Sequence, residues 1–197
     1  HRSNIMPLGA NKAAIMGVAG TAAAGDVVLL ASTTASADSS ISFTSQLTST
    51  YGEYIFEFYN IHPATNDANF TFQSTAGGNK AMTTSTFRLY HSEAGSAAIG
   101  YVADKDQANG NSYQVLTYGA DSDNDASLVG EFHLFNPAST TYAKHFYSRV
   151  QEMQNNDTSM DFFTAGYFNV TAAVTDIDFK FSSGNIDAGT IKLWGVK

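Results

Sequence analysis

The strongest constraint on the fold is a period of two in the apolar residues. Successive side chains of a β-strand point to opposite faces, so this period predicts strands with one face against a core and one toward solvent. The segment 176–181 shows it best, because three apolar residues alternate with three charged ones: Ile177, Phe179 and Phe181 against Asp176, Asp178 and Lys180. We therefore expect a half-buried strand here.

About ten segments share this pattern and are separated by Gly, Asn, Asp, Ser and Thr, at the spacing expected of two packed sheets. No segment carries apolar residues at three- and four-residue spacing over the length of a helix. The sequence predicts an all-β antiparallel β-sandwich, and the varied loop lengths favour a jelly roll over an up-and-down barrel. The expected strands are 27–30, 41–43, 54–59, 70–72, 87–91, 98–103, 113–118, 128–135, 145–150, 177–181 and 191–194.

The chain divides into a short extension and one domain. Residues 1–25 are small, poorly periodic and rich in Ala and Gly, and a β-type run begins after Gly25-Asp26. We expect 1–25 to be an arm or anchor and 26–197 a single β-sandwich domain, which 197 residues with 43% hydrophobic content can fill. The arm's apolar side chains would be buried against a neighbour, and the alternative is a loosely held terminus.

Composition narrows the classes of function. Lys and Arg total 10 against 18 Asp and Glu, a formal charge of -8, so we expect neither a nucleic-acid nor a membrane partner. There is no cysteine, which excludes a disulfide framework, a thiolate metal site and a thiol nucleophile. Charged residues make up only 14% of the chain, against about 25% in typical proteins. Such surfaces suit burial against identical neighbours in an assembly.

One acidic cluster has the spacing of a calcium loop. Carboxylates at every second position, Asp121, Asp123 and Asp125, can converge on Ca²⁺ when the backbone curls. The segment departs from an EF-hand, because Ala126 stands where the turn requires glycine and Phe132 where a bidentate Glu is required. A solvated acidic turn is the competing interpretation.

No catalytic residue and no cofactor is predicted. The five histidines have no metal-clamp spacing, and the chain lacks a nucleophile elbow. Glycoside hydrolysis needs two carboxylates, for which Glu53, Glu57, Glu93, Glu131 and Glu152 are available, but no local spacing selects a pair. Glu57 and Glu131, beside Phe residues on strands, are the best candidates.

Exposed aromatic residues offer a possible sugar-binding surface. Their amphipathic rings stack on a glycan or on a partner subunit, although tyrosine is also an ordinary strand residue. The candidates fall at or near the ends of expected strands: Tyr59, Tyr90, Tyr101, Tyr118 and Tyr147.

Three segments carry a resemblance to a known family: 53–65, from Glu53-Tyr54-Ile55-Phe56 to Ile61-His62-Pro63-Ala64-Thr65, 134–146, containing Leu134-Phe135-Asn136-Pro137, and 182–195, which ends in Ile191-Lys192-Leu193-Trp194-Gly195. Together they resemble a family of virion proteins of marine tailed bacteriophages. The resemblance covers about residues 27–197. It implies a β-sandwich in the virion and no particular activity.

Three hypotheses follow. The first is a non-enzymatic structural protein on the virion exterior, a head decoration or a fibre or tail-appendage subunit. It would assemble as a symmetric oligomer, expected to be a trimer, with other virion proteins as further partners. The second is a receptor-binding or carbohydrate-binding module that contacts a host-surface glycan. The third, a secreted glycan hydrolase, requires two carboxylates within reach of each other in a groove.

Overall fold

The computed structural model describes residues 26–197, so the predicted arm at 1–25 lies outside the described residues. This part of the chain is all-β, and it contains no helix long and apolar enough to cross a membrane. The strands are β1 (Val27–Thr34), β2 (Ile41–Phe43), β3 (Glu53–Pro63), β4 (Phe70–Gln73), β5 (Met82–Ser92), β6 (Ala97–Tyr101), β7 (Ala108–Gly110), β8 (Gln114–Val115), β9 (Leu128–Phe135), β10 (Lys144–Gln154), β11 (Thr158–Phe168), β12 (Ile177–Phe181) and β13 (Ile186–Val196).

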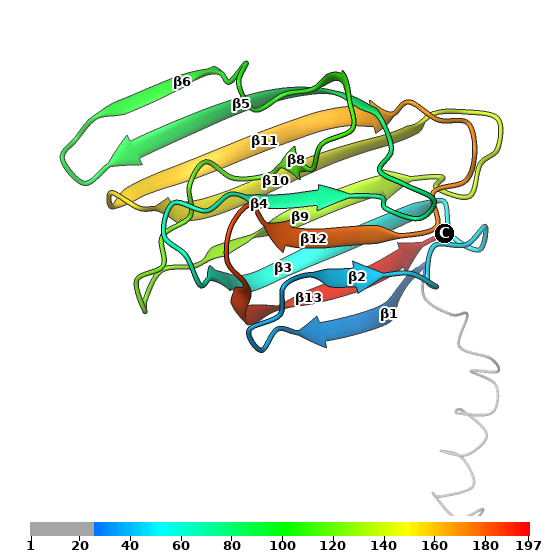
Figure 1. Ribbon diagram of the computed structural model, residues 1–197, viewed down its shortest axis with the longest axis horizontal. Coiled ribbons are helices and arrows are strands. Elements are labelled where there is room, and N and C mark those ends of the chain that lie inside the picture. The colour runs from blue at the N-terminus through cyan, green and yellow to red at the C-terminus, as the bar shows by residue number, and fades with distance from the viewer. Residues whose placement is uncertain (1–25) are drawn as a thin grey trace, which may run out of the picture.

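The strands form two antiparallel sheets packed face to face, a β-sandwich (Figure 1). The large sheet has the order β1-β13-β3-β9-β10-β11-β5-β6, with β7 also paired to β5. The small sheet has the order β2-β12-β4-β8 and lies in front of the large one in the view of Figure 1. We call the face of the large sheet that packs on the small sheet its inner face, and the opposite face its outer face.

Aromatic rings fill the space between the sheets. Phe179, in the centre of the small sheet, is fully buried and has its ring within 6.5 Å of six other Phe rings. Those rings come from β2, β3, β4 and β9: Phe43, Phe56, Phe58, Phe70, Phe72 and Phe132. Edge and tilted ring contacts of this kind add to the free energy gained by burial. The inner faces of β3 and β9 are therefore fixed against the small sheet.

Irregularities in neighbouring strands bend the large sheet. The register shifts around Gly189 in β13 and around Asn60 in β3, and both residues have positive φ, 114° and 49°. On β9, a Cβ at Gly130 would lie 2.8 Å from the Cα of Val150 on β10, so only glycine fits. Bulges raise local twist and re-aim side chains, and the neighbouring strands β13 and β3 carry them side by side.

The predicted all-β sandwich is confirmed. The jelly roll is not, because that topology divides eight strands between two sheets and here the sheets have nine and four. The strand at 191–194 is longer than expected and lies inside the large sheet, between β1 and β3. The predicted strand at 113–118 reduces to the two residues of β8.

One prediction about β12 is wrong. Asp176 and Asp178 were expected to face solvent, yet both are buried. The side chain of Asp178 accepts hydrogen bonds from the hydroxyls of Ser42 and Tyr113, the latter at 2.8 Å. Asp176 accepts bonds from Ser74, Thr75 and Ala76. The strand period gave the right faces, but loop segments cover the polar face of the small sheet.

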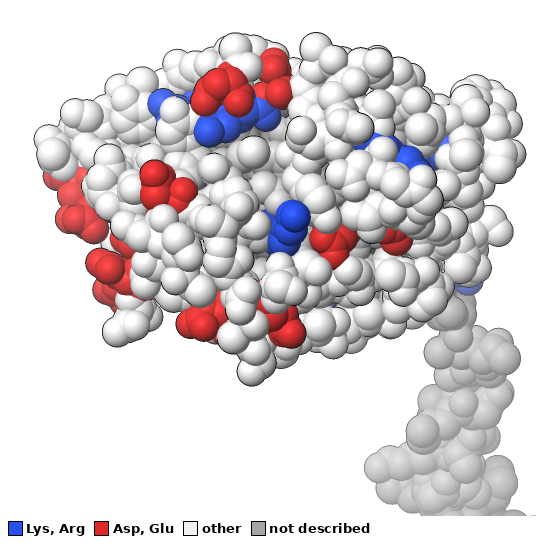
Figure 2. Space-filling view, viewed as in Figure 1, with Lys and Arg blue, Asp and Glu red and all other residues white. Residues whose placement is uncertain are grey.

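The surface of the molecule on the side where the small sheet lies carries few charged residues. Figure 2 shows Lys, Arg, Asp and Glu only in scattered groups over a mostly uncharged surface. This agrees with the low charged fraction of the sequence, 14%. Apolar and aromatic side chains therefore make up a larger share of the surface that a partner could contact.

Candidate binding face

The outer face of the large sheet carries most of the exposed large hydrophobic side chains of the described residues. Among the described residues, every large hydrophobic side chain with high exposure belongs to this face, except Tyr142 in a loop: Val27, Leu29, Tyr59, Phe87, Leu89, Ile99, Tyr101, Val129 and Tyr147. Monomeric soluble proteins rarely expose contiguous apolar surface without a function for it. The outer face is thus a candidate interaction surface.

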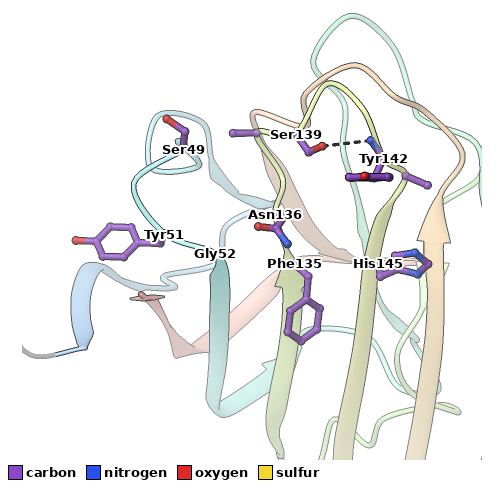
Figure 3. A pocket seen from close by; sticks show the side chains of 10 residues that line it. Ser49, Tyr51, Gly52, Phe135, Asn136, Ser139, Tyr142 and His145 are labelled. Atoms are coloured by element: carbon purple, nitrogen blue, oxygen red, sulfur yellow. Dashed lines mark hydrogen bonds between the residues drawn. The ribbon is translucent and has the colours of Figure 1, made fainter.

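A groove opens where this face meets the loops at one end of the sandwich (Figure 3). It has a volume of about 630 Å³ and is lined by loop residues together with the end of β9 and the start of β10: Ser49, Tyr51 and Gly52, then Phe135, Asn136, Ala138 and Ser139, then Tyr142, Ala143 and His145. Aromatic rings alternate here with hydroxyl and amide groups. Tyr142 is the most exposed ring of the described chain, at 74%.

A second hollow of about 450 Å³ continues this groove onto the outer face, because both share Phe135 and His145. Thr83, Ser85 and Ala165 are among the small residues that line it. The rings of Tyr147 and Tyr167 line its sides. We call the two hollows together the aromatic groove. It places stacking surfaces beside polar groups, as sites for extended polar ligands do.

A buried lysine holds the loops of the aromatic groove together. Lys144, the first residue of β10, is fully buried, and its ammonium donates to the carbonyl oxygens of Tyr142, Val170 and Thr171 at 2.7, 3.2 and 2.9 Å. Burial lowers the pKa of this lysine. The three hydrogen bonds tie the loop before β10 to the loop after β11, beneath the exposed ring of Tyr142.

Further along the outer face, charged residues form a row across four strands. Lys192, Glu57, Glu131 and Arg149 are successive register partners on β13, β3, β9 and β10. Three of them, Glu57, Glu131 and Arg149, line a hollow of about 390 Å³ beside Gly130. The fold therefore brings Glu57 and Glu131 opposite each other, which no local spacing predicted.

The surroundings of Glu57 and Glu131 indicate an ion network. Glu57 accepts hydrogen bonds from the Trp194 indole at 2.7 Å and the Tyr59 hydroxyl at 2.5 Å. Arg149 pairs with Asp161 at 2.8 Å. Glu57 thus has two hydrogen-bond donors as neighbours, and Arg149, the register partner of Glu131, is paired with Asp161.

His133 joins this network to the aromatic groove. Its Nδ1 lies 2.6 Å from Glu53 and its Nε2 lies 3.4 Å from Glu131. The ring stacks on Tyr147, with centroids 4.4 Å apart. Burial, followed by the charges of Glu53 and Glu131, raises the pKa of Tyr147. His133 faces outward as the alternation predicted, yet it is buried beneath its neighbours.

The predicted calcium ligands are not gathered into a site. Asp121 is buried and accepts the backbone N–H of Asp123 at 3.0 Å, which is a turn contact, while Asp123 and Asp125 are exposed. Within residues 26–197 no group of three or more His, Asp or Glu side chains is arranged to hold a metal. The calcium prediction gains no support from the fold.

The tyrosines selected from the sequence separate into two sets. Tyr59, Tyr101 and Tyr147 are exposed on the outer face. Tyr90 and Tyr118 lie on the other side, where the Arg88 guanidinium is 5.4 and 3.7 Å from their ring centroids. The groove residues Tyr51 and Tyr142, and Lys144 buried beneath the loop, were missed, although a tyrosine in a Ser- and Thr-rich loop is a detectable signal.

Comparison of the chain with protein-family models, with curated proteins and with solved structures gave no significant match.

Proposed function

We propose that this chain is a non-enzymatic structural protein of the exterior of a tailed-phage particle, in which the outer face of the large sheet contacts other subunits or the host. The observation that carries the proposal is the concentration of exposed apolar side chains on that one face. The resemblance of three sequence segments to virion proteins supports the location in a phage particle.

Exposed apolar side chains on the outer face favour binding to a partner that covers them. Side chains such as Phe87, Ile99 and Tyr101 gain free energy, about 25 cal/mol for each Å² of apolar surface, when a partner covers them. The net charge of -8 and the low charged fraction reduce competing contacts with nucleic acid. A head decoration or an appendage subunit in a symmetric oligomer would cover such a face.

The test is the position and copy number of the chain in a particle reconstruction. A decoration subunit should occupy dozens to hundreds of positions, and a fibre or tail subunit a small symmetric set. Density for the sandwich with its outer face against a neighbour is the expected result. Secretion of the chain without particles would overturn the proposal.

The aromatic groove favours carbohydrate binding as a second candidate function. Tyr142 lies beside Ser139 in a groove that Tyr51, Asn136 and His145 also line, and aromatic faces with nearby hydrogen-bonding groups suit sugar rings. A subunit on the particle exterior could use this groove to contact a host glycan, so the two functions are compatible.

Glycan-array binding followed by titration calorimetry tests this candidate. Tyr142→Ala should weaken binding at least about tenfold, because stacking on a ring is lost. The matched control is Tyr59→Ala, an exposed tyrosine outside the groove, and it should leave affinity unchanged. Release of reducing ends from a polysaccharide, abolished by Glu57→Gln, would instead establish the hydrolase hypothesis.

A further inference from the structure

The edge strand β6 is open and uncharged. All five of its residues, Ala97 to Tyr101, are exposed, and β5 is its only partner in the described chain. Natural sheets protect such edges with charges, proline or a covering segment. This strand has no charge and no proline, and in Figure 1 it forms the far edge of the large sheet.

The hydrogen-bond pattern of β5 and β6 shows which backbone groups remain free. The Ser92 N–H donates to the Ser96 carbonyl at 2.8 Å, and the Val102 N–H donates to the Thr86 carbonyl at 3.1 Å. Bonded and non-bonded pairs alternate in an antiparallel ladder. The regular register therefore turns the N–H and C=O groups of Ala97, Ile99 and Tyr101 away from β5, toward the open edge.

We propose that β6 pairs with the β6 strand of a second copy of this chain, antiparallel about a two-fold axis at Ile99. In this register Ile99 faces the partner's Ile99, and Tyr101 faces the partner's Ala97. Each of these positions presents free backbone groups, so the pairs are hydrogen-bonded ones. The ring of Tyr101 then lies beside the methyl group of the partner's Ala97 and not against another ring.

Side chains on the outer face support the same register. Ile99 is 72% exposed and Tyr101 60%, and they lie beside Leu89 and Phe87 of β5. A two-fold axis perpendicular to the sheet keeps both outer faces on the same side. The apolar patches of the two copies then join across the axis into one continuous surface, in which the side chains of Ile99 and Tyr101 contact those of the partner strand.

The competing occupant of this edge is β1 of another copy, at the opposite edge of the large sheet. That contact would be head-to-tail and would give open chains, whereas pairing of β6 with itself closes at two copies. The β6 contact has two-fold symmetry, so it is a different contact from the one that would hold the expected trimer together. It goes beyond the proposed function, because it concerns the purified chain without any particle.

Sedimentation of the full chain over a range of concentrations tests the pairing. A reversible dimer is expected, and Ile99→Lys should weaken it at least about tenfold because two like charges then face each other at the axis. Val129→Lys, which removes an exposed apolar side chain far from β6, should leave it unchanged. A chain that stays monomeric, or a dimer that survives Ile99→Lys, would overturn the proposal.

The natural absence of cysteine allows a direct test of register. The Cα atoms of a facing bonded pair are about 5.5 Å apart, within disulfide range. Ile99→Cys should therefore cross-link under mild oxidation. Ala97→Cys alone should not, although it should cross-link when mixed with Tyr101→Cys. The two-fold register would be contradicted if Ala97→Cys alone cross-linked as well as its mixture with Tyr101→Cys. It would also be contradicted if Ile99→Cys cross-linked only when mixed with Leu29→Cys.

Discussion

The two faces of the large sheet both carry aromatic residues, but those on the inner face are buried and those on the outer face are exposed to solvent. On the inner face, rings such as Phe56 and Phe132 are fully buried against Phe179 of the small sheet. On the outer face, Phe87 and Tyr147 are 43% exposed with nothing in the described chain above them. The inner face accordingly determines stability, and the outer face is available for recognition. Substitutions on the two faces should separate these properties.

The largest loss of stability should come from Phe179→Ala. Its ring contacts six others, so truncation leaves a cavity in the centre of the core and should cost about 3–5 kcal/mol of unfolding free energy. Urea denaturation measures the change. Phe179→Leu should cost clearly less, and equal losses from both variants would argue against the cavity as the cause.

A polar exception on the inner face should make stability depend on pH. Glu152 is fully buried; desolvation raises its pKa to about 8, against the opposing effect of the Tyr118 N–H at 2.5 Å. The folded chain keeps this proton between pH 4.5 and about 8 while the unfolded chain releases it. Stability should therefore fall as pH rises through this window, by a loss on the order of a few kcal/mol.

Glu152→Gln removes that titration and keeps an oxygen for the Tyr118 N–H. Denaturation between pH 5 and 8.5 should show a flatter profile for the Gln variant and higher stability than the parent at pH 8.5. Glu131→Gln, on the outer face, is the control and should leave the slope of the parent unchanged. Parallel profiles for Glu152→Gln and the parent would contradict the assigned proton.

Where the faces meet, Lys144 should give an intermediate effect. Lys144→Met removes three hydrogen bonds to carbonyl oxygens and should cost about 1–3 kcal/mol. Hydrogen exchange should also rise in the loops at 136–143 and 169–176, because the lysine ties them together. Unchanged exchange there would show that the loops are held by other contacts.

The smallest change in stability should follow Tyr142→Ala. This ring is 74% exposed, so its loss should alter unfolding free energy by less than about 0.5 kcal/mol. Thermal denaturation of the variant beside the parent measures it. A larger loss would mean that Tyr142 packs as a core residue and would remove it as a recognition group.

The sequence by itself determined the all-β class, most of the strands and most of the side-chain faces, but the expected strands did not include β11, Thr158–Phe168. Alternation in 54–59 and 145–150 correctly placed Phe56 and Val150 inward and Tyr147 and Arg149 outward. These are local properties, since they depend only on the geometry of a strand. The same alternation also predicted that Asp178 faces away from the core, but not that loops would cover it.

Only the tertiary structure decided which strands are neighbours and which residues share a site. The facing of Glu57 and Glu131 depends on the register between β3 and β9, strands separated by more than 60 residues in the chain. The aromatic groove joins three parts of the sequence, and the free edge of β6 exists because no other strand within residues 26–197 covers it. Strand partners and register are set by long-range packing, which leaves no periodic trace in the sequence.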